Sequence, residues 1–169
     1  MTTTLYAQPY DISAEGFYFG TIEQYQERAV KAVNAYSDQV EEFEIQFIDG
    51  EDIDCALAQA FGLNQSNIGA LFAAIDDWDE HQKRAFIIAV GECGYAFDPA
   101  GDDVDDFEVD FYVVDSMREL AELFVDEGLF GDIPEHLQFY IDYDAIARDL
   151  EVDYSATEIA GQHLVYRCA

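Results

Sequence analysis

The sequence has few basic residues. Its 169 residues include 7 Lys and Arg against 37 Asp and Glu, which gives a formal net charge of −30 at pH 7 with neutral histidines. A protein that binds nucleic acid directly needs a basic face to neutralise phosphates. Seven cations spread from Arg28 to Arg167 are too few for such a face. We therefore expect no direct binding of DNA or RNA.

Long apolar runs are also absent. None reaches the length needed to span a bilayer or to form a signal peptide. The negative charge disfavours anionic membranes as well. The sequence therefore predicts a soluble, cytoplasmic protein with no membrane partner.

Common catalytic motifs are missing. The sequence contains no GxxxxGK[ST], GxGxxG, GxSxG, HExxH or EF-hand loop. The three cysteines lack CxxC spacing, and the three histidines lie far apart. Acidic clusters at residues 76–80 and 102–106 could hold a cation, but a solvated charged face explains them better. We predict no catalytic residues, no metal site and no cofactor.

The apolar content predicts a folded chain despite the charge. Half of the residues are hydrophobic, and the chain contains 13 Phe, 11 Tyr and 1 Trp. Aromatic side chains remove large apolar areas from water, so they can offset the entropy lost on ordering. We therefore expect a folded protein with charged surfaces.

Residues 1–61 predict a mixed α/β domain. Residues 3–7 and 43–47 indicate strands, the latter by strict alternation. A helix is expected to begin after Thr21, and another over residues 52–61. The first helix has its expected apolar stripe at Ile22, Tyr25, Ala29, Val33 and Tyr36.

Residues 62–103 predict a domain of short helices. One is expected to be capped by Ser66, and another covers residues 80–90. Residues 98–103 have turn chemistry and heavy charge, which is typical of a linker. The helix after Ser66 has its expected buried stripe at Ile68, Leu71, Phe72, Ile75 and Trp78.

Residues 104–169 predict a second mixed α/β domain. After a strand at 107–113, a capping box at Ser116 begins a helix, and Asp142 is expected to cap residues 143–150. Residues 157–167 indicate one closing strand interrupted by a glycine. The predicted fold class is α+β, with three small domains in an elongated chain. An elongated shape would spread the net charge at a density like that of duplex DNA, in which 30 charges occupy about 51 Å, or about 15 base pairs.

Four segments carry a resemblance to a known family. They are residues 43–49, residues 92–95, residues 119–121 with 124–134, and residues 140–150. In these segments the chain resembles the ArdA family of antirestriction proteins. The resemblance implies an elongated homodimer of three small domains per chain that mimics B-form DNA. It also implies a non-enzymatic inhibitor that occupies the DNA groove of type I restriction-modification enzymes.

The resemblance implies a function that is spread over a surface rather than placed at a few residues. The family's antirestriction segment matches residues 144–154. The predicted mimic carboxylates are Asp106, Asp110, Asp115, Glu122, Asp126, Glu127, Asp132, Asp144, Asp149, Glu151, Asp153 and Glu158. The candidates for a dimer interface are Phe124, Phe130, Tyr140 and Tyr143.

Two alternative functions would explain the acidic composition differently. An acidic protein of a halophile would use its carboxylates for solubility in high salt. A carboxylate-based, metal-dependent hydrolase would use a few of them as ligands. Neither accounts for the resemblance of the C-terminal segment.

Overall fold

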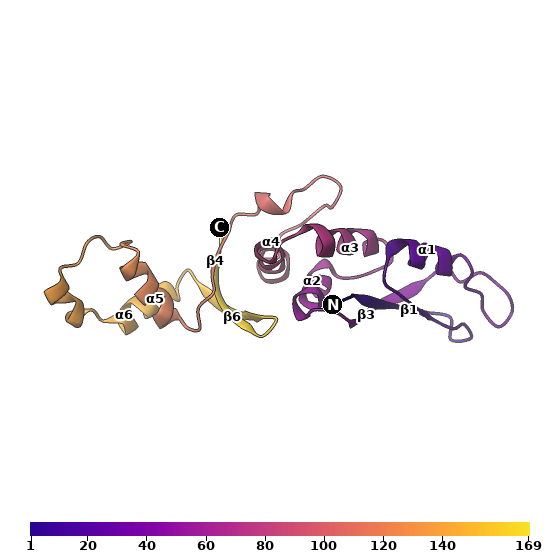
Figure 1. The fold of residues 1–169 in the computed structure, drawn as a ribbon, viewed down its shortest axis with the longest axis horizontal. Helices are drawn as coiled ribbons and strands as arrows, with labels where there is room; N and C mark the ends of the chain where they lie inside the picture. Colours follow the sequence, from indigo (N-terminus) through magenta and orange to yellow (C-terminus); the bar gives the residue numbers. More distant parts are fainter. The chain divides into compact units, whose positions relative to one another are not determined.

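The chain begins with a three-stranded antiparallel sheet, seen in a computed structural model that describes all residues 1–169 (Figure 1). In this sheet β1 (Thr4–Pro9) lies between β2 (Phe17–Phe19) and β3 (Phe43–Asp49). Leu5 and Ala7 are fully buried, as the two-residue period of a strand requires. The strands predicted at residues 3–7 and 43–47 are confirmed.

Helices cover the first sheet and continue beyond it. They are α1 (Ile22–Ala29), α2 (Asp52–Phe61), α3 (Ile68–Asp77) and α4 (Glu80–Phe86). The prediction that the apolar stripe of α1 extends to Tyr36 was wrong. The helix ends at Ala29, Val33 forms an isolated bridge with Gln39, and Tyr36 is 81% exposed.

Two further details of the first helices differ from the prediction. Asn67, not Ser66, is the N-cap of α3, because the Ser66 hydroxyl donates a hydrogen bond to Asn64 Oδ1 instead. The helix predicted over residues 80–90 divides into α4 and a π-helix at Ile87–Glu92. An Asp79–Gln82 capping box begins α4.

Aromatic side chains form much of the core of this first part. The rings of Phe19 and Tyr25 lie 5.1 Å apart, so α1 packs onto the sheet. Farther along the chain, the ring of Phe86 lies 4.5 Å from that of Phe61 and 5.1 Å from that of Trp78. The aromatic residues therefore serve mainly as core residues here.

A second antiparallel sheet follows, with the strand order β4-β6-β5. Its strands are β4 (Val109–Tyr112), β5 (Ser155–Ile159) and β6 (Gln162–Cys168). The single closing strand predicted at residues 157–167 was wrong. The chain reverses there through Ala160 and Gly161, whose φ angles of 52° and 76° are those of a tight two-residue hairpin turn.

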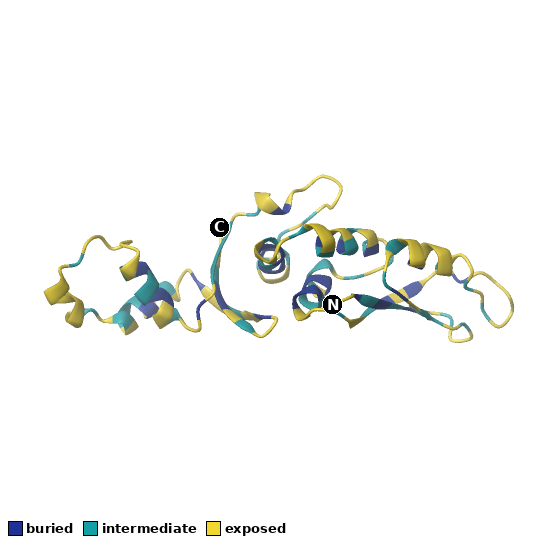
Figure 2. Ribbon diagram, viewed as in Figure 1, coloured by how far each residue is buried: buried dark blue, intermediate teal, exposed yellow.

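The helices of this second part are α5 (Met117–Asp126) and α6 (Tyr143–Leu150), with a 3₁₀-helix, η3 (Glu135–Tyr140), between them. Leu120 and Phe124 of α5 pack with Tyr154 and Val165 to form the core. The segment between α5 and α6 is almost wholly exposed (Figure 2). The predicted bounds of α6 are confirmed.

The chain divides into two compact units, Met1–Phe107 and Glu108–Ala169. Together they give a mixed α+β fold, as predicted from the sequence. The finer division at residues 61/62 and 103/104 stays a prediction. No helix is both long enough and apolar enough to cross a membrane.

Candidate functional site

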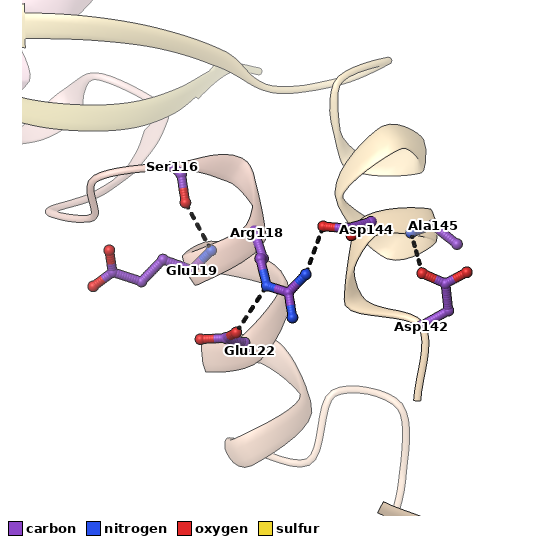
Figure 3. Close-up of polar contacts among 7 residues, drawn as sticks. All are labelled: Ser116, Arg118, Glu119, Glu122, Asp142, Asp144 and Ala145. Carbon is purple, nitrogen blue, oxygen red and sulfur yellow. Dashed lines mark hydrogen bonds and ion pairs between the residues drawn. The ribbon is translucent and has the colours of Figure 1, made fainter. Parts of the chain in front are cut away.

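The acidic surface of the second unit is built on helix α5. The Ser116 hydroxyl accepts a hydrogen bond from the backbone N–H of Glu119 at 3.1 Å, as the sequence predicted for the N-cap. The Glu119 carboxylate accepts one from the backbone N–H of Asp115 at 2.9 Å. Leu120 and Phe124 face the core, whereas the Arg118 guanidinium points from α5 toward α6 and contacts Glu122 on the way (Figure 3).

Helix α6 packs against α5 and carries the next group of carboxylates. The Asp142 side chain caps it by accepting a hydrogen bond from the backbone N–H of Ala145 at 3.0 Å. Ala147 is its one buried residue, and Leu150 packs half-buried against the core of the second unit. The helix is therefore held by a modest apolar contact area together with polar contacts.

Arg118 joins the two helices. Its Nε donates to Glu122 Oε1 at 3.3 Å, and its Nη1 donates to Asp144 Oδ1 at 2.7 Å (Figure 3). The guanidinium also lies 5.8 Å from the ring centroid of Tyr143. The hydrogen bond that Arg118 donates to Asp144 raises the pKa of Arg118. One cation thus holds a carboxylate from each helix.

The second sheet contains a comparable arginine. Arg167 of β6 lies directly opposite Asp110 of β4, and its Nε donates to Asp110 Oδ2 at 3.2 Å. The Asp110 hydrogen bond raises the pKa of Arg167. Its guanidinium lies 5.2 Å from the ring centroid of Tyr154. The remaining base of this unit, Arg148 on α6, is exposed and makes no ion pair.

The twelve predicted mimic carboxylates fall into two groups. Arginines bind Asp110, Glu122 and Asp144, and Glu158 lies 3.7 Å from His163 Nδ1. The other eight are exposed and form no ion pair: Asp106, Asp115, Asp126, Glu127, Asp132, Asp149, Glu151 and Asp153. Asp106 belongs to the first unit, in a short 3₁₀-helix (Val104–Asp106), and the others belong to the second.

The four aromatic residues predicted for a dimer interface differ in exposure. Phe124 is 3% exposed and belongs to the core of the second unit, so it is unavailable to a partner. Tyr143 is half-buried beside Arg118. Phe130 and Tyr140 are 54% and 83% exposed. Sequence reasoning missed three exposed apolar neighbours, Leu129, Leu137 and Phe139.

The arrangement offers a high density of negative charge. No group of three or more His, Cys, Asp or Glu side chains in the chain could hold a metal ion. The candidate site is thus an array of carboxylates on an ordered scaffold. Such an array can attract and contact a basic surface.

Comparison with protein families gives a match over most of the chain. The family described as antirestriction protein (ArdA) matches residues 19–164, which include most of both units. No curated protein matches the chain.

Proposed function

Because the chain belongs to the ArdA antirestriction protein family, we propose that it inhibits a type I restriction-modification enzyme by occupying the groove in which that enzyme binds DNA. Carboxylates take the place of DNA phosphates in this proposal. The observation that carries it is the set of eight exposed, unpaired carboxylates, of which seven belong to the second unit and Asp106 belongs to the first.

Charge is available in both units. The first unit contains 22 acidic and 4 basic residues, and the second contains 15 and 3. Duplex DNA carries about one negative charge per 1.7 Å of axis. An elongated chain of three small domains would bring these charges close to that density, so we propose this arrangement for the molecule.

The mechanism needs no chemistry and no sequence readout. Phosphate contacts position a protein on DNA without identifying bases. A phosphate mimic therefore competes with every DNA target of the enzyme in the same way. We expect inhibition across enzymes that recognise different sequences.

The test is competition for a purified type I methyltransferase core. The protein should displace a labelled duplex, and its affinity should fall steeply with salt because the ion pairs release counterions. With six to ten such contacts, binding should weaken by about 10³-fold or more between 50 and 200 mM salt. Inhibition that stays the same across this range would contradict the proposal.

The family's antirestriction segment can be tested by charge removal. Replacing Asp144, Asp149, Glu151 and Asp153 together by their amides should weaken competition strongly, whereas each single change should do far less. The matched control removes four exposed acids of the first unit: Glu23, Asp38, Glu41 and Glu44. An equal loss in the two variants would show that the position of the carboxylates in the C-terminal segment has no special weight.

We further propose that two copies pair through the segment between α5 and α6. Exposed apolar side chains that cluster in sequence are typical of protein interfaces. This segment contains Leu129, Phe130, Leu137, Phe139 and Tyr140, all at least 45% exposed. The resemblance to a family of homodimers also supports a second copy of the chain as the partner of this segment.

A further inference from the structure

Arg118 is an unexpected residue in a surface that imitates phosphates. It forms ion pairs with two of the predicted mimic carboxylates, Glu122 and Asp144, and so cancels one of their two charges. The second unit has only three bases against 15 acids, so one of its few cations lies within the array. If only the number of negative charges mattered, a base here would weaken the function.

The contacts of Arg118 indicate a different role. Glu122 lies one turn along the same helix, whereas Asp144 lies in the first turn of α6. The planar guanidinium can bind two carboxylates in fixed directions, which a single ammonium group cannot do. Arg118 therefore joins α5 to α6 at a defined distance.

Few residues of α6 are buried. Ala147 is its single buried residue, Leu150 packs half-buried against the core of the second unit, and no residue of η3 before the helix is buried. The link through Arg118 therefore adds to a modest apolar contact. Asp149, in the last turn of α6, and Glu151, which follows it, move with the helix.

We propose that Arg118 is a positioning residue that holds α6 against α5, so that the carboxylates of the C-terminal segment keep the spacing that the enzyme's basic groove requires. This inference rests on the proposed function. At this point of the surface, geometry outweighs one unit of charge.

A matched pair of variants separates geometry from charge. Arg118→Gln and Arg148→Gln each change the formal charge from −30 to −31, but only Arg118 holds carboxylates. If charge alone mattered, the two variants would behave alike, and each would compete with duplex at least as well as the wild type. The positioning role predicts that Arg118→Gln weakens competition by about threefold to tenfold, the size of one lost ion-pair network, while Arg148→Gln does not weaken it.

The conservative variant adds a second readout. Arg118→Lys keeps the charge but places all of its donors on one nitrogen instead of a planar fork, so it should restore competition only in part. Hydrogen exchange of the α6 amides, measured without the enzyme, should be faster in Arg118→Gln than in Arg148→Gln. Equal exchange in these two variants, or Arg118→Gln competing as well as Arg148→Gln, overturns the positioning role.

A second pair covers the case in which Arg118→Gln unfolds the unit. Asp144→Asn and Asp149→Asn each change the charge to −29, and only the first breaks the link between the helices. The positioning role predicts a greater loss of competition for Asp144→Asn than for Asp149→Asn, and an equal or smaller loss overturns it.

If the wild type itself displaces no duplex, the proposed function fails and the role of Arg118 in it fails too. If the wild type displaces duplex and the pairs behave alike, only the role of Arg118 fails.

Discussion

At the scale of single residues, one ion pair is buried. Lys83 Nζ of α4 lies 2.7 Å from Asp54 Oδ1 of α2, and their side chains are 11% and 4% exposed. Replacing Lys83 by Met leaves the Asp54 carboxylate buried without a partner. We expect the free energy of unfolding to fall by about 3–5 kcal/mol, measured by chemical denaturation.

An exposed lysine provides the control for this prediction. Lys31 lies 3.1 Å from Glu27, and both side chains are 70% exposed. Because solvent screens this pair, Lys31→Met should cost no more than about 1 kcal/mol. Similar losses for Lys31→Met and Lys83→Met would mean that the buried pair is not coupled as its geometry indicates.

Ion pairs between side chains that are distant in sequence could not be predicted from the sequence. The pairing of Arg118 with Glu122 follows from their four-residue spacing on one helix. The pairings of Arg118 with Asp144 and of Lys83 with Asp54 have no local signal, because they depend on how helices pack. The sequence therefore predicted an acidic surface but not which carboxylates arginines neutralise.

At the scale of elements, local signals predicted the structure best. Helix α2 ends at Gly62, and Ser116 and Asp142 begin α5 and α6. Each signal is a backbone or side-chain preference that acts within one turn. The predicted extension of α1 to Tyr36 failed because apolar spacing alone does not require a helix to continue.

The hairpin between β5 and β6 was missed because its turn lacks the usual residues. Asn-Gly is the common sequence for this turn, and here Ala160 precedes Gly161. Ala160 has a φ of 52°, a left-handed conformation that costs an alanine about 1 kcal/mol. Ala160→Asn should therefore raise the free energy of unfolding by about 0.5–1 kcal/mol in urea denaturation, since asparagine tolerates this conformation. Gly161→Ala should lower it, and a loss of stability in Ala160→Asn would contradict this account of the turn.

At the scale of the whole molecule, the net charge of −30 has two competing explanations. A halophilic protein depends on salt to screen repulsion among its carboxylates and should unfold when salt is removed. A DNA mimic must stay folded at the moderate ionic strength at which it competes with DNA. We expect cooperative thermal unfolding, followed by circular dichroism, in low as well as high potassium chloride. Unfolding at room temperature in low salt would support the halophile.

Dimerisation is the other property of the whole molecule that can be tested directly. Phe139 and Tyr140 are 92% and 83% exposed, so replacing both by Ser should leave the fold intact. At micromolar concentration the wild type should sediment above the 19.1 kDa of one chain, and this variant should sediment at that mass. Ile12 and Tyr36, 99% and 81% exposed in the first unit, provide the control, and changing both to Ser should leave the dimer unchanged. A wild type that sediments as one chain would end the proposal. A dimer would also matter for the inhibitor itself, because two chains double the charge to the equivalent of about 30 base pairs of duplex.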